Sequence, residues 1–438
     1  MSAVPRLATA LAATAALAAA PAQAAPAPGP PRPPLSVTTY YVDCAAGSDS
    51  ASGTGPATAW RTLAKASGAA YRPGDRILFR RGTTCTGTFA PTASGAAGAP
   101  LAAGAYGGGA EPRLAGGGAR AAILLDNVQY WELRDLDVTN TGPATTTERR
   151  AGILVRLHDA GTGRHYLVDG VSVHDVNGAD FKDPDPSGGI LFAVQGSAKP
   201  TRFDGVTIRN SSVAHTDRTG IGTSSTWGRR PAHPNGPGTS FAPITGLSVH
   251  HNTVRDAGGD GIVVQNADNE GGFLLICNGA GMISDRNTFR YNVSVNDRNT
   301  TGPCGVISVV CAPATRTLVH NNTVTTNAPD TVVVSSNGPG GVTFRDNIFA
   351  GAAAGSPLAD AHNSYDHNLY ARISPVPATD AGAVRGEPRF LAPYDVRLRS
   401  GSPALGAGVP VPGGGDRDFY GNPVPDPPNL GADQGRGK

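Results

Sequence analysis

Short apolar segments alternate with polar turns through the middle of the chain, and one unit recurs from about residue 170 to residue 350. Each copy has an alternating apolar strand, a tight turn at Asn, a second strand, a polar turn with Asp and Gly, and a third strand. Five copies place the Asn of the first turn at Asn210, Asn252, Asn292, Asn322 and Asn347. Three short strands per repeat, each extending a parallel sheet over inward Val, Ile, Leu and Phe, predict an all-β parallel β-helix.

The recurrent Asn residues are interpreted as structural. Asn tolerates left-handed backbone geometry and can hydrogen-bond to the Asn stacked on it in the next coil. Successive Asn residues are 42, 40, 30 and 25 residues apart, whereas a minimal coil needs only about 20–25 residues. We expect the excess to form loops, which is where a rigid solenoid usually carries its functional sites.

One interval departs from the repeat. Gly261-Ile-Val-Val264 and Gly272-Phe-Leu-Leu-Ile276 both resemble the start of the third strand, yet Gly261 and Gly272 are eleven residues apart. A full coil does not fit between them at ~3.3 Å per residue. Either one segment is not that strand, or one or more coils are missing. We favour missing coils, which would shorten the middle of any substrate groove.

The N-terminus has the pattern of an export signal. Arg6 is followed by the apolar run Leu7 to Ala20 and by Ala22-Gln23-Ala24, which fits a cleavage site near Ala24. A disordered Ala-rich leader is the alternative. The Pro-rich stretch that follows predicts a tether. No later stretch has eighteen apolar residues, so we expect a secreted protein with no membrane partner.

Charge and cysteine content narrow the partners. The net charge of +2 is spread along the chain, and a nucleic-acid-binding face needs concentrated basic charge, so we expect no nucleic-acid partner. Cys44 and Cys85 are expected to pair, whereas the pairing of Cys277, Cys304 and Cys311 stays open. Their spacing does not suit a zinc site.

Motifs at both ends carry a family resemblance. The N-terminal ones include Tyr40-Tyr-Val-Asp-Cys44, Trp60-Arg-Thr-Leu63 and Pro73-Gly-Asp-Arg-Ile-Leu-Phe79, and the C-terminal ones include Pro388-Arg-Phe390, Gly401-Ser-Pro-Ala404 and Asp418-Phe-Tyr-Gly-Asn422. With the repeats, they make residues 38–434 resemble the secreted pectate-lyase-like right-handed parallel β-helix proteins. The resemblance implies a fold but no single reaction, because this superfamily includes lyases, hydrolases, epimerases and adhesins.

The expected organisation has five parts. They are a signal peptide (1–24), a Pro-rich tether (25–37), an N-terminal cap with the first coils (38–115), the β-helix coils (116–375) and a C-terminal closing segment (376–438). In similar β-helix enzymes the third sheet and its flanking loops form the sugar-binding cleft.

The polar turn before the third strand concentrates charge. Stacked coils would align a row of candidate catalytic residues, which are Asp217, Arg218, Asp260, Glu270, Asp297 and Arg298. Two carboxylates could serve a glycosidase, and a base with nearby cations, including Lys182, could serve a polysaccharide lyase. The alternative is a ladder of salt bridges that only balances charge.

Two loops supply further candidates. Trp227 with Arg229, Arg230 and His233 combines an aromatic face with cations, as a sugar subsite would. The alternative is a Trp folded onto the solenoid edge. Asp180, Asp183 and Asp185 could hold Ca²⁺ through oxygen ligands, although a loop without metal is the simpler interpretation.

The sequence therefore predicts a monomeric secreted protein that acts on extracellular polysaccharide or oligosaccharide, as a polysaccharide lyase or a glycoside hydrolase. A non-catalytic glycan-binding or surface protein on the same fold is the alternative. Ca²⁺ is a candidate cofactor, and no other is indicated.

Overall fold

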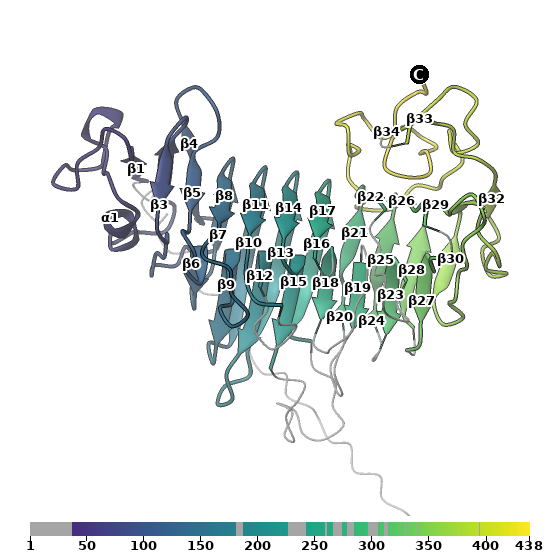
Figure 1. Ribbon diagram of the computed structural model, residues 1–438, viewed down its shortest axis with the longest axis horizontal. Coiled ribbons are helices and arrows are strands. Elements are labelled where there is room, and N and C mark those ends of the chain that lie inside the picture. Colours follow the sequence, from purple (N-terminus) through teal and green to yellow (C-terminus); the bar gives the residue numbers. More distant parts are fainter. Residues whose placement is uncertain are drawn as a thin grey trace, which may run out of the picture. The chain divides into compact units, whose positions relative to one another are not determined.

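Most coils of the chain add one strand to each of three parallel sheets, and the protein is a right-handed parallel β-helix, as the sequence predicts. The computed structural model describes residues 37–180, 187–226, 242–258, 261–265, 274–277, 284–296, 305–310, 314–328, 330–338, 340–393 and 395–438. Figure 1 shows the strands stacked in chain order, with the closing segment beside the last coils.

The first sheet, sheet A, contains the first strand of each coil. Its path is β1 (Thr39–Val42), β2 (Arg76–Arg80), β4 (Leu101–Tyr106), β7 (Trp131–Arg134), β10 (Thr162–Asp169), β13 (Arg202–Arg209), β16 (Ile244–His250), β21 (Thr288–Arg290), β25 (Thr317–His320), β28 (Val342–Arg345) and β30 (Ser364–Asp366). The short strands β20 (Ser284–Asp285) and β24 (Ala314–Thr315) pair beside this path.

Sheets B and C contain the second and third strands. Sheet B is β3 (Thr84–Thr86), β5 (Arg113–Ala115), β8 (Asp137–Asn140), β11 (Ser172–Val176), β14 (Ser212–Thr216), β17 (Thr253–Ala257), β22 (Val293–Val295), β26 (Thr323–Thr325), β29 (Ile348–Ala350), β31 (Leu369–Ala371) and β32 (Val384–Arg385). Sheet C is β6 (Ala121–Asp126), β9 (Ala151–His158), β12 (Gly188–Gln195), β15 (Thr219–Ser225), β18 (Ile262–Gln265), β19 (Leu274–Cys277), β23 (Ile307–Val310) and β27 (Val334–Ser336).

The core follows from the alternation along the strands. In β12, Ile190, Phe192 and Val194 point inward and are buried. Phe192 contacts Phe203 of β13 and Tyr166 of β10 edge to face, with ring centroids 5.3 Å and 5.9 Å away. Inward residues of successive coils thus form continuous apolar columns, which bury surface that no single coil could bury alone.

The Asn ladder between sheets A and B is confirmed, with one correction. Backbone N–H groups donate to the side-chain oxygen of the next Asn at 2.9–3.2 Å through Asn252, Asn292, Asn322, Asn347 and Asn368. Asn210 is not a member, because Ser211 occupies that position and donates its N–H to Asn252. Asn210 is instead the left-handed residue of its turn, at φ 52°, and His251 fills that role one coil later.

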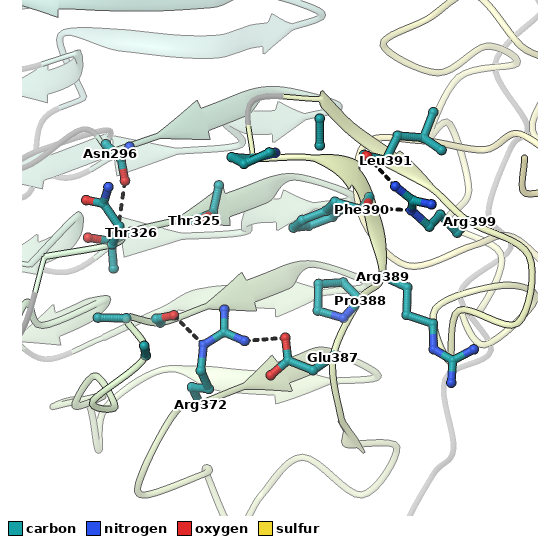
Figure 2. Close-up of a pocket in the computed structure, with 16 residues that line it drawn as sticks. Asn296, Thr325, Thr326, Arg372, Glu387, Pro388, Arg389, Phe390, Leu391 and Arg399 are labelled. Carbon is teal, nitrogen blue, oxygen red and sulfur yellow. Dashed lines mark hydrogen bonds and ion pairs between the residues drawn. The ribbon is translucent and has the colours of Figure 1, made fainter.

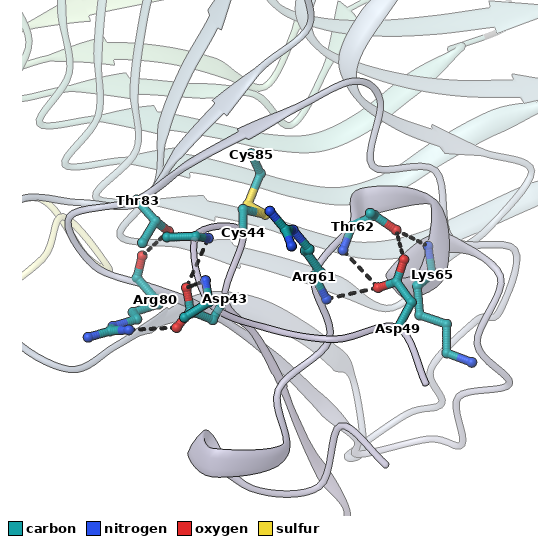
Figure 3. Close-up of a disulfide and its surroundings, with 11 residues drawn as sticks. Asp43, Cys44, Asp49, Arg61, Thr62, Lys65, Arg80, Thr83 and Cys85 are labelled. Carbon is teal, nitrogen blue, oxygen red and sulfur yellow. Dashed lines mark hydrogen bonds and ion pairs between the residues drawn. A yellow bond between two sulfur atoms is a disulfide. The ribbon is translucent and has the colours of Figure 1, made fainter. Parts of the chain in front are cut away.

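The N-terminal cap closes one end of the helix with η1 (Pro56–Thr58), α1 (Leu63–Ser67) and a disulfide between Cys44 and Cys85. The expected pairing is confirmed, and the two Cα atoms are 5.3 Å apart. Beside it, Asp43 accepts hydrogen bonds from the backbone of Ala45 and Ala46 and pairs with Arg80 (Figure 3).

The C-terminal closing segment folds back along the solenoid. Its hairpin β33 (Phe390–Ala392) and β34 (Asp395–Leu398) lies beside the ends of β22, β26 and β29 (Figure 1). Leu398 and Leu430 pack on Ile348 and Leu369, which are outer-face residues of sheet B. The segment therefore covers an apolar face that the last coils would otherwise expose.

The irregular interval after Gly261 is resolved by strand pairing. Both segments are sheet C strands, because β18 pairs with β19 and β19 with β23. In sheets A and B, β16 pairs directly with β21 and β17 with β22. Sheets A and B thus lack a strand at this level, and sheet C has one more. The favoured interpretation of missing coils therefore holds for sheets A and B, whereas sheet C keeps both strands at this level.

Within the described part of the chain, no helix has the length and apolar character needed to span a bilayer.

Candidate functional site

Long connections flank sheet C, such as those from β11 to β12 and from β15 to β16, whereas the turn from β14 to β15 has only two residues. We call the turn from each sheet B strand to the next sheet C strand the B–C corner. It joins β11 to β12 and β14 to β15, and the segment from β15 to β16 lies on the other side of sheet C. A rigid sheet with long loops on both edges is the usual setting for a ligand site on a solenoid.

Three predicted site residues meet at the B–C corner. Asp217 and Arg218 lie between β14 and β15, and Asp180 lies in the preceding connection, between β11 and β12. The Asp217 carboxylate accepts a hydrogen bond from the Gly178 N–H at 3.0 Å, and Arg218 Nε is 3.2 Å from Asp180 Oδ1. The Arg218 side chain is 5% exposed and that of Asp180 is 77% exposed. The corner therefore holds a buried guanidinium beneath an exposed carboxylate.

The local backbone is fixed by close packing. A Cβ on Gly178 would lie 2.6 Å from Ser187 Oγ, and one on Gly258 would lie 2.2 Å from the carbonyl oxygen of Asp217. Only glycine fits at such approaches. Beneath them, Arg150 Nη1 donates to Asn177 Oδ1 at 2.8 Å. Asp217 and Arg218 are thus presented from a tightly packed turn, which suits a site that must hold its geometry.

The other predicted site residues lie outside the described residues. They are Lys182, Asp183, Asp185, Trp227, Arg229, Arg230, His233, Asp260, Glu270, Asp297 and Arg298. Gly258 and Asn296, close before Asp260 and Asp297, are described. Gly258 follows β17 and Asn296 follows β22. These strands stack in register on β14, because Ser212 of β14 is paired with Thr253 of β17, and Thr253 with Val293 of β22. The same corner therefore extends to the residues that precede both predicted carboxylates.

The outer face of sheet C is apolar and buried in its first coils. Leu154 and Leu191 are register partners on β9 and β12, and both are almost fully buried, as is Ala193. Ser224 on β15 is the register partner of Ala193 and is also buried. In these coils the outer face of sheet C is thus closed to solvent.

A long charge ladder exists, but on sheet A. The last outward position of successive strands is occupied by Arg134, Asp169, Arg209, His250, Arg290, His320, Arg345 and Asp366. Arg134 and Arg209 both donate to Asp169 Oδ2 at 2.8 Å. Burial alone would raise the pKa of Asp169, but the hydrogen bonds from Arg209 and Asn210 outweigh it and lower that pKa.

Neutral histidines separate the arginines in the middle of this ladder. Burial is the main cause that lowers the pKa of His250 to about 2, and the positive charge of the neighbouring Arg290 adds to the shift. Burial also lowers the pKa of His320 to about 4, although a hydrogen bond with Asn321 opposes the shift. The closing segment covers these residues, with the Gly414 carbonyl accepting from Arg290. Sheet A, which the sequence did not single out, thus carries a charge ladder in which arginines predominate.

A second feature of the B–C corner was missed from sequence. A cavity of about 640 Å³ lies where the corner meets the closing segment, and we call it the Arg372 pocket. Figure 2 shows Arg372 and Glu387 side by side, with Pro388 and Phe390 on one side and Asn296 and Thr326 at the opposite end. Its residues come from four coils and from the folded-back segment. Only the motif Pro388-Arg-Phe390 gave a sequence signal, and that signal indicated fold.

Of the three candidate Ca²⁺ ligands, Asp180 lies within the described residues, and Asp183 and Asp185 lie outside them. Among the described residues, no group of three His, Cys, Asp or Glu side chains is arranged to hold a metal ion. Asp180 is engaged by Arg218 at 3.2 Å, and a guanidinium at that distance competes with a cation for the carboxylate.

Comparisons with known proteins place the fold beside carbohydrate-active enzymes. No known family model matches the chain. A lacto-N-biosidase of Bifidobacterium longum subsp. longum is 24% identical over 91% of this chain, which spans 36% of that protein's length. The crystal structure of a GH136 lacto-N-biosidase from Eubacterium ramulus is 18% identical with a TM-score of 0.61, over 80% of this chain and 67% of that one. Its native form gives a TM-score of 0.58.

Proposed function

We propose that the chain is a secreted glycoside hydrolase that cleaves an extracellular oligosaccharide or polysaccharide in a groove along sheet C. The observation that carries the proposal is the meeting of Asp217, Arg218 and Asp180 at one corner of that sheet. Alignment of almost the whole chain with a lacto-N-biosidase supports glycosidic chemistry over other functions of the fold. A lacto-N-bioside is therefore a sensible first substrate.

The mechanism needs two carboxyl groups across the scissile bond. In β-helices, carboxylates one strand apart are about 4.8 Å apart and those two strands apart about 9.6 Å. The first separation suits a retaining glycosidase and the second an inverting one. We propose Asp217, Asp260, Glu270 and Asp297 as the carboxylates from which the pair is drawn. Asp217 has a fixed orientation, since the Gly178 N–H holds one of its oxygens.

The basic residues have supporting roles in this proposal. Arg218 is buried beneath Asp180 and orients its carboxylate toward the corner. Arg298, Lys182, Arg229, Arg230 and His233 are proposed to bind substrate, with Trp227 stacking on a sugar ring. The protein is proposed to act as a monomer, after export and signal-peptide removal.

The test is a substrate screen with the purified full chain. Lacto-N-biosides, pectic polymers, alginate, glucans and arabinans are incubated with enzyme, and new reducing ends are measured together with ultraviolet absorbance from unsaturated products. New reducing ends without that absorbance support hydrolysis. Unsaturated products would indicate β-elimination by a lyase instead, with a positioned base and Arg218 or Arg298 stabilising the developing negative charge.

The alternative is a glycan-binding protein without turnover, and one observation favours it. The additional strand β19 lies between β18 and β23 in sheet C, although the sheet B strands that precede β18 and β23, β17 and β22, pair directly with each other. Saturable glycan binding with no product would support this alternative.

The proposed Ca²⁺ requirement is tested in the same screen. Dialysis against a chelator should lower activity or the unfolding temperature, and restoring Ca²⁺ should recover it, if Asp180, Asp183 and Asp185 hold the ion. Unchanged activity and stability after chelation would remove the ion from the account.

A further inference from the structure

We propose that the Arg372 pocket binds a neutral pyranose unit and is a distal subsite for the glycan cleaved along sheet C. The role in substrate binding rests on the proposed function, whereas the ability to bind a sugar does not. The pocket has a fixed polar pair, an aromatic wall and a position along the B–C corner, and each of these suits a sugar ligand.

A carboxylate and a guanidinium are held side by side. Arg372 Nε donates to the Gly351 carbonyl at 2.8 Å, and Arg372 Nη1 pairs with Glu387 Oε2. Their side chains are 34% and 60% exposed, respectively. Within the described residues, no hydrogen bond engages Arg372 Nη2 or Glu387 Oε1, so the pair offers one donor and one acceptor. Two neighbouring hydroxyl groups of a pyranose need that combination, because each hydroxyl both donates and accepts.

The wall opposite this pair is apolar. Phe390 is half-buried and stands beside the buried Pro388, facing the strand that carries Thr325 (Figure 2). At the far end, Asn296 Oδ1 accepts from the Asn327 N–H at 2.9 Å, which orients the Asn296 amide. An aromatic face with a few fixed polar groups is the common composition of a small-ligand site, and sugar rings place their C–H faces on aromatic rings.

The Arg372–Glu387 pair favours a neutral sugar over a uronate. The Arg372 charge is matched by Glu387, and that carboxylate would repel an acidic group bound next to it. Arg399 donates to the carbonyls of Phe390 and Leu391 at 3.1 Å and 2.6 Å, so it serves the backbone of the closing segment. Arg389 points away from the Arg372 pair in Figure 2.

The position of the pocket suits a chain that lies along the solenoid. Asn296 follows β22, two strands beyond β14 and Asp217, and Arg372 follows β31, three strands further. At about 4.8 Å per strand, the pocket begins roughly 10 Å from Asp217 and ends roughly 24 Å from it. An oligosaccharide extended along the B–C corner reaches both places.

The test separates binding from cleavage. Neutral oligosaccharides and oligouronides are titrated into the full chain by calorimetry at low and high salt. The wild type is compared with the pocket variants Phe390→Ala and Glu387→Gln. Asp416→Asn, which changes an exposed carboxylate of the same segment, is the control. We expect Phe390→Ala to weaken neutral-sugar binding about tenfold, which corresponds to the loss of one apolar ring contact. Glu387→Gln should also weaken it, Asp416→Asn should not, and salt should have little effect because the ligand is uncharged.

Two results would overturn the proposal. One is binding that is unchanged in both pocket variants while their unfolding temperatures match the wild type. The other is preferential, salt-sensitive binding of oligouronides. Turnover of a disaccharide substrate too short to reach the pocket is measured in parallel. If the wild type does not turn this substrate over, the proposed function is contradicted. The proposed binding of a sugar in the Arg372 pocket is not affected by that result.

Discussion

Asp346 makes the attachment of the closing segment dependent on pH. The residue is fully buried, and its Oδ1 accepts from the Val409 N–H at 3.1 Å. Its Oδ2 is buried without a hydrogen-bond partner among the described residues. Burial raises the pKa of Asp346 to about 7, against a lowering contribution from that hydrogen bond. The folded protein therefore holds a proton there that the unfolded chain releases near its ordinary pKa of 3.8.

The sign and size of the effect follow from linkage. Because the folded state binds the proton more tightly, Asp346 favours folding most below pH 4, and this contribution is lost as pH rises to about 7. A shift of this size corresponds to a free-energy change on the order of 4 kcal/mol across that window. Asn is a suitable replacement, because the backbone of Asp346 is left-handed at φ 54° and Asn tolerates that region.

The assay compares unfolding of the wild type and Asp346→Asn from pH 4 to pH 8.5. We expect the variant to gain stability relative to the wild type as pH rises, with the difference levelling off above about pH 7. Taking the difference removes the contributions of other titrating groups. A difference that stays flat over the whole range would refute the reasoning. Limited proteolysis of the closing segment gives a second readout of its release.

Three further predictions concern the ladder, the corner and the cap. Asn322→Ala removes side-chain hydrogen bonds to both neighbouring coils and should lower the free energy of unfolding by about 3–5 kcal/mol, whereas Asn210→Ala should cost only about 1 kcal/mol, both measured by denaturant titration. Gly178→Ala places a Cβ 2.6 Å from its neighbour and should reduce both stability and turnover, whereas Gly108→Ala, with open space, should change neither. Cys85→Ala should destabilise the protein by roughly 3 kcal/mol under oxidising conditions and by nothing under reducing ones.

The fold was predictable because each coil repeats the same local pattern. The apolar alternation and the Asn turn are local signals, and each stacks on its own copy. The error at Asn210 has a physical reason: the left-handed residue and the ladder residue are adjacent, and Asn suits both roles. The sequence indicated that β19 is a third strand of a coil, which belongs to sheet C. It could not indicate that β18 pairs directly with β19, because that pairing depends on long-range contacts.

The candidate site was only partly predictable. Asp217, Arg218 and Asp180 meet because one repeat position stacks on the next, which the spacing could indicate. The sheet A ladder was missed because its members, such as Arg134, Asp169 and Arg209, occur once per coil at irregular separations. The Arg372 pocket depends on a segment that folds back from the C-terminus, and a local pattern cannot register that contact.

The central claim is that carboxylates at the B–C corner cleave a glycosidic bond. The most direct measurement is the rate of reducing-end release by the full chain and by Asp217→Asn, Asp260→Asn, Glu270→Asn and Asp297→Asn, with Asp416→Asn as the control. We predict that two of the four carboxylate variants lose at least about 100-fold in kcat while folding normally, and that the control stays within about twofold of the wild type. Full activity in all four carboxylate variants would contradict the central claim.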